Sequence, residues 1–520
     1  MTAPTPTASA PTGSVPGFDD SDRAILLDLC RNARTRAERD DRPVLVSWAK
    51  PLPAVDVMAV WRRGRVLTRR SMLWRSAWDQ GCVVALDTAH ELPGRGADRV
   101  RSVRDAWARL SHEPVDGGTA DPSQPSGGGP LAIGGFAFSP DGTGPQGRLP
   151  DTLVWVPAFQ LRSRSAAAGD LPGPAELRLN AVLTRDDDPE RTAKELGRIA
   201  EQYLDHETPV STPVSTPVST PVSTPVSTPV STPAGGSAAP AGPRTWDSTE
   251  IPAADDWREL VRRATGSIRA GTFEKVVLAR ELRVTASADF DVAAAVDRLR
   301  AVNPGTTVFA VGHGEDTFLG ATPEYLVRVE GREVHALGLA GTTPRGGTPE
   351  EDAVRERELV DSAKIQHEHD VVVRMLCDAL AHGCAEVTAE TPPRVVKLAH
   401  VQHLSTKVRG TLGAEPGTGV LDFVERLHPT PALGGQPRRQ ALSWLAENEG
   451  FDRGWYAGVV GWADPSGQGQ FAVAIRSALL SGAAASLYAG CGLVADSDPA
   501  VEYAETCAKL RPMLSALELE

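Results

Sequence analysis

The sequence predicts an α+β protein in which antiparallel sheets are flanked by helices. Strand-like runs and amphipathic helical runs are mixed along the chain without a regular β-α-β alternation, which disfavours a parallel sheet. Two strand-like runs near the C-terminus are separated only by a short Ser-Gly turn, as in a hairpin. Hydrophobic residues make up 41% of the 520 residues and charged residues 23%, so sizeable cores can be buried.

The charge and cysteine content narrow the functional class. A net charge of −13 offers no general attraction to nucleic acid or to an acidic membrane, although a single pocket can still be basic. The six cysteines include no CxxC pair, so neither a zinc site nor a disulfide framework is expected. The N-terminus lacks the pattern of a secretory signal, and no apolar run reaches the length of a membrane span. We therefore expect a cytoplasmic protein that binds neither nucleic acid nor membrane.

The first part of the chain divides into a tail and a mixed α/β region. Residues 1–16 are rich in Pro, Thr, Ser and Ala, which predicts a disordered tail. Residues 17–205 form the N-terminal α/β part of the fold. Within this part we expect a long loop, two strands and a helix, at residues 112–130, 131–140, 151–161 and 189–205, respectively.

A repeat then separates the two parts of the chain. The tetrapeptide TPVS occurs six times between Thr208 and Ser231, within a Pro/Thr/Ser/Val-rich linker at 206–250. Proline at every fourth position removes backbone donors that helices and sheets need, so an extended spacer is predicted. An interaction motif is the alternative.

The remaining residues, 251–520, carry the best-marked pattern and form the predicted catalytic domain. Residues 275–284 alternate as a strand does, and residues 317–329 predict two strands that meet at Thr322–Pro323. One continuous helix is expected from Thr348, as N-cap, to Gly383, and a last helix from Asp498 onward. The hairpin noted above is expected to join strands at 471–480 and 485–494.

Three carboxylates are candidate metal ligands. Glu368 shares a helical stripe with Ile365 and Val372, where an apolar residue is expected; either it reaches water at the helix edge or it meets a cation. Glu502 and Glu505 lie on one face of the last helix. They form either a solvated acidic face or, with Glu368, a site for a hard cation such as Mg²⁺.

Other polar residues stand out because they interrupt apolar strands. Lys275 opens a strand and is either an edge lysine or a functional amine. Glu324 lies where a strand meets a turn and is either a solvated turn residue or a functional acid. Arg476 lies within a run of small apolar residues, where a guanidinium needs a carboxylate, which a substrate can supply. Gly490 and Gly492 mark either a bend of the sheet or backbone amides that approach an anion.

Taken in order, these segments resemble the chorismate-utilising enzymes. The matching stretches are FEKVVLAR, FLGATPEYLV, ALAGTTPRG, SAKIQHEHDVVV, VQHLSTKVRG, LHPTPALGG, YAGVVGWAD, VAIRSALL and YAGCGLVADSDPAVEYAET. They cover about residues 257–515, and a looser match includes IGGFAFSPDG in the N-terminal part. The resemblance implies the layered fold of anthranilate synthase component I.

The resemblance also implies the site and the reaction. Lys275 would be the base that activates water for attack at C2 of chorismate, and Glu324 the acid that protonates the departing C4 hydroxyl. Magnesium would be held by the three carboxylates, and the substrate by residues of five further segments. The implied metal ligands are Glu368, Glu505 and Glu502, and the implied substrate-binding residues are Gly341, Thr342, His403, Arg476, Gly490, Gly492 and Lys509.

Within the family, HPTPA at 428–432 is similar to the sequence of isochorismate synthases. The implied product is therefore isochorismate, destined for menaquinone, siderophore or salicylate synthesis. The alternatives are a salicylate synthase, an amine-forming synthase and a non-catalytic scaffold. A monomer without a glutaminase subunit is expected. Two residues depart from the family pattern: Ile365 stands where relatives often carry an acid, and Gln470 where a glutamate is common, which places metal affinity in doubt.

Overall fold

The computed structural model describes most of the chain outside its N-terminal tail and central repeat. The described residues are 18–118, 129–140, 148–163, 173–204, 245–397, 401–413 and 417–519. The predicted tail, the TPVS repeat and much of the loop expected at 112–130 lie outside these residues.

Two large sheets form the frame of the molecule. Within the described residues the larger sheet has thirteen strands, almost all antiparallel. Their spatial order is β10 (Trp246–Ile251), β11 (Lys275–Ala286), β23 (Ala484–Leu493), β22 (Ser477–Ser481), β13 (Asp316–Thr322), β12 (Thr307–His313), β2 (Arg70–Arg75), β3 (Cys82–Leu86), β8 (Phe159–Ser163), β9 (Gly173–Leu183), β1 (Val44–Val55) and β5 (Val115–Gly118), with β19 (Gly435–Gln436) paired to β11.

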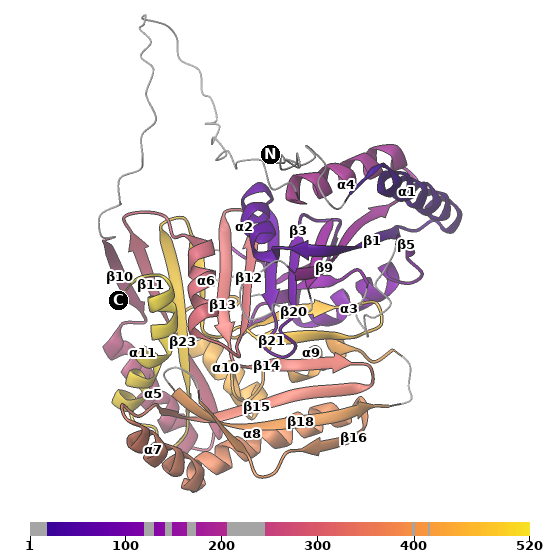
Figure 1. Cartoon of the computed structure of the whole chain (residues 1–520). Coiled ribbons are helices and arrows are strands. Elements are labelled where there is room, and N and C mark those ends of the chain that lie inside the picture. The colour runs from indigo at the N-terminus through magenta and orange to yellow at the C-terminus, as the bar shows by residue number, and fades with distance from the viewer. Residues whose placement is uncertain are drawn as a thin grey trace, which may run out of the picture.

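The smaller sheet has ten strands within the described residues and crosses below the larger one, as Figure 1 shows. Its order is β16 (Cys384–Ala389), β18 (Val401–Leu412), β15 (Glu333–Pro344), β14 (Tyr325–Glu330), β21 (Gly469–Val473), β20 (Val459–Ala463), β6 (Ala132–Phe136), β7 (Thr152–Val156) and β4 (His90–Leu92), with β17 (Arg394–Lys397) paired to β18.

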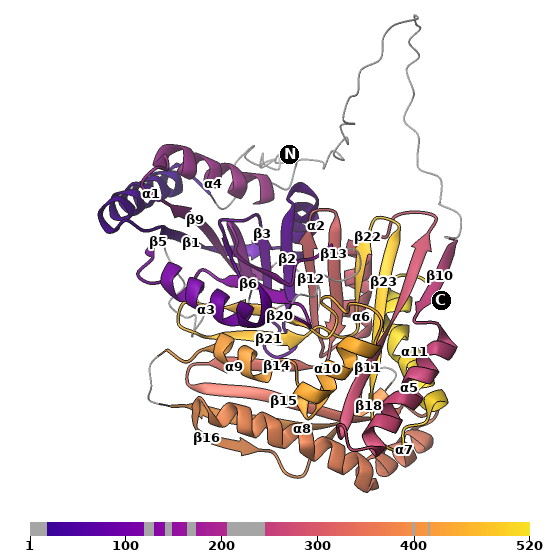
Figure 2. The ribbon, with the colours of Figure 1, turned by 180° about the vertical axis from the view of Figure 1, so that it is seen from behind.

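Helices cover the outer faces of both sheets. On the larger sheet these are α1 (Asp20–Asp40), α2 (Val57–Leu67), α4 (Pro189–Leu204), α5 (Ala254–Arg269), α6 (Val292–Val302) and α11 (Pro499–Ala516). On and beside the smaller sheet lie η1 (Gly96–Asp98), α3 (Arg99–Leu110), α7 (Pro349–Asp361), α8 (Ala363–Ala381) and α9 (Val420–Leu427), while α10 (Arg438–Asn448) packs on β19 and β11. Figure 2 shows α8 running along β15 and β18 from behind.

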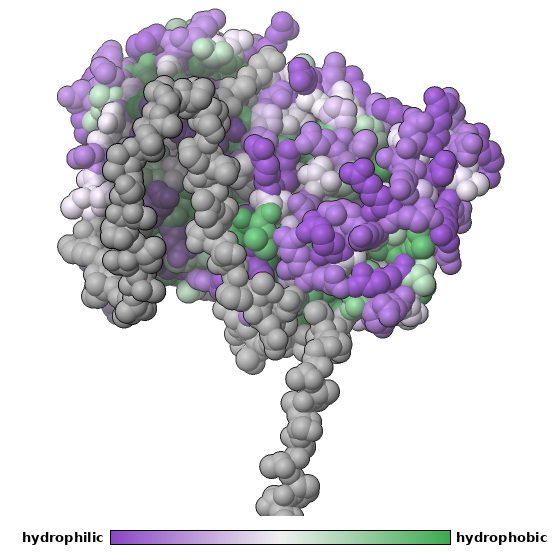
Figure 3. Space-filling view, turned by 90° about the horizontal axis from the view of Figure 1, so that it is seen from above, coloured by the Kyte–Doolittle hydropathy of each residue, from purple (hydrophilic) through white to green (hydrophobic). Residues whose placement is uncertain are grey.

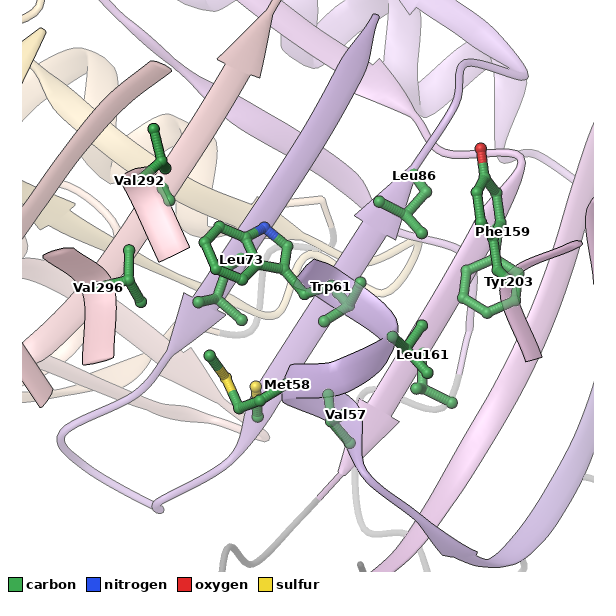
Figure 4. Packing of buried hydrophobic residues seen from close by; sticks show 14 of the residues in the cluster. Val57, Met58, Trp61, Leu73, Leu86, Phe159, Leu161, Tyr203, Val292 and Val296 are labelled. Atoms are coloured by element: carbon green, nitrogen blue, oxygen red, sulfur yellow. The ribbon is translucent and has the colours of Figure 1, made fainter. Parts of the chain in front are cut away.

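The N-terminal and C-terminal parts are built into the same two sheets. Strand β2 pairs with β12 across the larger sheet, and β6 pairs with β20 across the smaller one. The apolar core is shared as well: in Figure 4, Trp61 of α2 and Leu73 of β2 lie beside Val292 and Val296 of α6. Because burial of apolar surface drives folding, neither part can complete its core alone.

Most expected elements of the C-terminal part are present. One helix and one strand that were predicted as continuous are each divided in two. The helix expected from Thr348 to Gly383 is two helices, α7 and α8, because Ser362 leaves helical geometry and caps α8 through its side-chain oxygen. The strand expected at 471–480 is split into β21 and β22, which belong to different sheets. The break includes Arg476, whose φ is +52°.

Two strands were missed at the borders of predicted loops. Residues 115–118, within the expected loop at 112–130, form β5 and pair with β1. Strand β10 begins at Trp246, inside the range assigned to the linker, and pairs with β11. Both are edge strands, and neither VDGG nor WDSTEI has the regular apolar alternation by which a strand is predicted.

The surface is mainly hydrophilic. Figure 3 shows hydrophilic side chains over most of the coloured atoms on the face seen from above. Among the described residues, no helix combines the length and the apolar character required to span a bilayer.

Candidate functional site

A single cavity of about 320 Å³ brings all the predicted site residues together. It lies at the junction of the two sheets, where β11, β15, β18 and β23 meet α8 and α11. The predicted residues that line it are Lys275, Glu324, Gly341, Thr342, Glu368, His403, Arg476, Gly490, Gly492, Glu502, Glu505 and Lys509. They come from positions up to 234 residues apart, so their convergence is a property of the fold.

Lys275 and Glu368 form a nearly buried ion pair in this cavity. Lys275 Nζ donates to Glu368 Oε1 over 2.5 Å. The lysine opens β11, and the glutamate lies on the face of α8 that meets the cavity. The apolar stripe predicted on this helix is therefore real, and the acid within it finds a cation.

Gly492 leaves the space that this pair occupies. It lies in β23 opposite Val277 of β11, in unbroken antiparallel register. A methyl group at Gly492 would lie 2.9 Å from Lys275 Cε and 3.3 Å from Glu368 Oε1. Gly490 is two residues earlier on the same face of the strand, and its carbonyl accepts from Lys509 Nζ over 2.9 Å. The glycine pair thus belongs to a regular strand, and it forms neither a bend nor a nest.

Glu324 is a buried carboxyl between β13 and β14. Its backbone N–H donates to Thr322 Oγ1 over 3.2 Å, which fixes the turn at the pre-proline step. Only 6% of the residue is exposed. Burial raises the pKa of Glu324 to about 7, against the opposing charges of Arg476, Lys275 and Lys509. Near neutral pH this carboxyl therefore holds a proton that it can donate.

Arg476 lies where the chain passes from the smaller sheet to the larger one. Its left-handed backbone, uncommon for a residue with a side chain, turns the chain between β21 and β22. Burial lowers the pKa of Arg476, and the charges of Glu505 and Glu324 oppose that effect. No carboxylate within the described part of the chain forms an ion pair with it, which leaves the guanidinium available for a substrate carboxylate.

The Gly341–Thr342 step is a bulge that faces the same cavity. The pairing of β15 with β18 shifts register between Ala340 and Thr342, and Gly341 has a φ of +78°. Thr342 Oγ1 lies 3.0 Å from Nδ1 of His403 on β18. Burial, together with the charges of Arg476 and Lys509, lowers the pKa of His403 to about 3, so the ring is neutral.

Ile365, one of the two departures from the family pattern, has a packing role in the structure. It lines the cavity one helical turn before Glu368. A Cβ at Gly341 would lie 2.4 Å from Ile365 Cγ2, so the isoleucine packs directly on the bulge. The other departure, Gln470, lies elsewhere: it lines a second cavity and donates to Asp79 Oδ2 over 3.2 Å.

Helix α11 contributes two carboxylates and a lysine. Lys509 Nζ lies 2.5 Å from Glu505 Oε1, one turn earlier on the helix. Burial raises the pKa of Glu502, a hydrogen bond with Ser497 opposes the shift, and the charge of Glu505 adds to it. A cation placed beside Glu502 would offset its loss of hydration.

The donor set suits magnesium by its chemistry. Three carboxylates without histidine or cysteine are the hard oxygen ligands that Mg²⁺ prefers. Among the described residues no three acidic, histidine or cysteine side chains converge closely enough to hold a metal ion, and Glu368 and Glu505 each contact a lysine. Each of these two contacts involves one carboxylate oxygen, Oε1, and an ionised carboxylate has further lone pairs with which it can bind a cation.

Several lining residues were missed by the sequence analysis. They are apolar or already paired side chains that no motif search weighs as functional: Val277, Ala432, Leu433, Arg453, Tyr456 and Ile475. Arg453 and the nearby Glu449 have the i, i+4 spacing of a common surface ion pair, which gave no sign that they are buried.

Comparison with known proteins shows the family to which the chain belongs. Residues 31–227 and 231–518 match the family model described as "Chorismate binding enzyme". The chain belongs to this family. It is 31% identical over 496 residues to the isochorismate synthase MenF of Bacillus subtilis (strain 168), an alignment that covers 94% of this chain and 96% of that protein.

Solved structures of chorismate-binding enzymes share the fold. MenF, the menaquinone-specific isochorismate synthase from Escherichia coli, superposes with a TM-score of 0.70 at 23% identity, covering 94% of this chain and 100% of that one. Anthranilate synthase component I from Streptococcus pneumoniae superposes with a TM-score of 0.61 at 20% identity, covering 83% and 92%. The predicted layered fold with antiparallel sheets is confirmed.

Proposed function

We propose that this chorismate-binding enzyme is an isochorismate synthase, which adds water at C2 of chorismate and releases the C4 hydroxyl. The observation that carries the proposal is that one cavity holds Lys275, the buried acid Glu324 and Arg476, a guanidinium with no ion-pair partner among the described residues. The reaction needs one group that accepts a proton and one that donates it. The near-full-length similarity to an isochorismate synthase supports the choice of product.

Each proton has an assigned carrier. Lys275, the base in our assignment, takes a proton from the attacking water as the new C2–O bond forms. The ring double bond shifts, the C4–O bond breaks, and Glu324 gives its proton to the departing hydroxyl. Atoms balance because one water enters and one leaves, and solvent restores the two side chains. In our assignment the base and the acid face opposite sides of the ring.

The remaining residues bind and orient the substrate. Arg476 and Lys509 supply positive charge for the substrate carboxylates, and the Gly341–Thr342 bulge supplies backbone and hydroxyl groups. His403 is a neutral wall residue that hydrogen-bonds to Thr342. When bound by Glu368, Glu505 and Glu502, Mg²⁺ would neutralise a substrate carboxylate and make the ring a better electrophile.

One incubation tests the proposed function. Purified protein, chorismate and Mg²⁺ are combined and the products are separated by chromatography. We expect a mixture of chorismate and isochorismate, because the reaction only relocates a hydroxyl. Stoichiometric pyruvate would identify a salicylate synthase, incorporation of ammonium nitrogen an amine-forming enzyme, and complete inertness a scaffold.

A further inference from the structure

The edge of β11 next to Lys275 has a gap in its strand pairing. On this edge β19 pairs with Lys275 and Val276, and β10 pairs only from Glu281 onward. Residues 277–280 pair with β23 on the other edge of β11, but on this edge no strand in the described part of the chain pairs with them. Backbone groups at such a gap require other partners, because an unpaired buried N–H or C=O is costly.

Two buried side chains fill most of this gap. Arg453 Nη2 donates to the carbonyl of Val277 over 2.6 Å, and the amide of Ala279 donates to Glu449 Oε1 over 2.7 Å. The guanidinium thus acts as the donor, and the carboxylate as the acceptor, that a neighbouring strand would supply.

The remaining groups on this edge are also satisfied. The Val277 amide donates to the carbonyl of Gly434 over 3.0 Å, and Trp257 Nε1 donates to the carbonyl of Ala279 over 3.3 Å. The edge is therefore fully paired from Lys275 to β10, although no strand runs along its middle.

The pair is held rigidly. Arg453 Nε and Nη2 donate to the two carboxylate oxygens of Glu449, each over 2.6 Å, and Arg453 Nη1 donates to the carbonyl of Leu433 over 3.0 Å. Arg453 is 3% exposed and Glu449 is 4% exposed. The guanidinium also lies 4.3 Å from the ring centroid of Phe138 in the N-terminal part.

A buried ion pair of this kind contributes little to stability once desolvation is counted, so its hydrogen bonds point to a geometric role. Its bonds connect β11, the strand that carries Lys275, to the carbonyl of Leu433, which lines the same cavity. Arg453 itself lines the cavity. A movement of the pair would therefore shift Lys275 relative to that wall.

We propose that Arg453 and Glu449 are positioning residues: they replace a missing strand at the edge of β11 and so fix Lys275 against the cavity wall. The proposal rests on the proposed function, since it assigns them to the base of that reaction. Lysine at position 453 keeps the charge, but a single ammonium cannot meet both carbonyls and both carboxylate oxygens in one plane.

The test compares Arg453→Lys with a matched variant. Arg178 and Glu176 form another fully buried pair, at 0% and 4% exposure, in β9 of the N-terminal part. We expect Arg453→Lys to lower kcat by roughly 10- to 100-fold, because small displacements of a catalytic group cost that much. KM should change less, and Arg178→Lys should keep kcat near the wild-type value. Millimolar guanidinium, but not NaCl, should partly restore kcat to Arg453→Ala.

A second readout does not depend on the reaction. Amide hydrogen exchange of the segment 275–280 should be faster in Arg453→Lys than in the wild type, and unchanged in Arg178→Lys. The proposal is overturned if Arg453→Lys keeps both kcat and exchange near wild type, or if both variants lose kcat in proportion to their loss of Tm. If the wild-type protein makes no isochorismate, the proposed function is wrong. The hydrogen exchange of residues 275–280 then still shows whether Arg453 and Glu449 hold β11 in place.

Discussion

At the scale of single residues, Glu324 is the group whose environment departs most informatively from that of a free side chain. Burial raises its pKa to about 7, so the carboxyl keeps its proton at pH 6 and loses it above neutrality. A general acid must be protonated to act. We expect kcat/KM to fall as pH rises through about 7. Replacement by Gln should remove this limb and lower activity by about 10²- to 10⁴-fold, as measured by initial rates across pH.

The same shift predicts a gain of stability in the inactive variant. The pKa of Glu324 is about 7 in the folded protein against 4.5 as its ordinary value, so the unfolded chain loses its proton first. Stability therefore falls as pH rises from about 4.5 to about 7, by on the order of 3 kcal/mol. Glu324→Gln should unfold at a higher Tm than the wild type at pH 8 and at a similar Tm at pH 4. A lower Tm at pH 8 would show that the charge is compensated.

Gly492 offers a steric test of the Lys275–Glu368 pair. A methyl group there would lie 2.9 Å from Lys275 Cε, so Gly492→Ala should push the lysine aside. We expect a loss of kcat of about tenfold or more with little loss of Tm, measured by steady-state kinetics and thermal unfolding. Gly266→Ala on α5 is the control, since its added methyl group meets nothing within 4 Å. An unchanged kcat in Gly492→Ala would show that the position of Lys275 does not matter for the reaction.

At the scale of elements, α8 and α11 each bring an acid to the cavity from distant parts of the chain. Glu368→Ala and Glu505→Ala should each weaken Mg²⁺ binding sharply, measured by calorimetric titration in the absence of substrate. Glu358→Ala, on the exposed face of α7, is the matched control. If both active-site variants bind Mg²⁺ as the wild type does, these carboxylates are not its ligands.

The elements also show what a pattern can reveal. The strand β11, the hairpin of β22 with β23 and the capped start of α11 have local marks in the sequence, which predicted all three. The breaks at Ser362 and Arg476 could not be predicted. A polar residue inside a periodic run does not by itself indicate that a helix ends or that the chain passes to another sheet. The Arg453–Glu449 pair was hidden for a related reason: burial depends on what packs against the pair, and its spacing is that of an exposed one.

At the scale of the whole molecule, only the resemblance to a family predicted that the polar residues of the cavity form one site. Local patterns left Lys275, Glu324 and Glu505 as ordinary surface charges, and only the folded sheets bring them into one cavity. The sharing of both sheets by the N-terminal and C-terminal parts could not be predicted either. Strand partners such as β2 and β12 are far apart in the chain and carry no pairing signal of their own.

In the sequence the TPVS repeat stands between the N-terminal and C-terminal parts, and proline at every fourth position predicts an extended spacer. We expect that replacing residues 208–231 by a Gly/Ser segment of equal length leaves kcat, KM and Tm nearly unchanged. Activity assays and thermal unfolding of the two chains side by side provide the check. A replaced chain that folds but loses activity would assign the repeat a role beyond that of a spacer.

The origin of the oxygen at C2 distinguishes attack by water from every other route to the product. If Lys275 activates water while Glu324 protonates the leaving group, the oxygen at C2 comes from solvent and the oxygen at C4 is lost. The measurement is the mass spectrum of isochorismate formed from unlabelled chorismate in H₂¹⁸O, with the label located by fragmentation. We predict ¹⁸O at C2 in the earliest product. Unlabelled isochorismate, or pyruvate in place of isochorismate, would contradict the addition of water at C2 by Lys275 and Glu324.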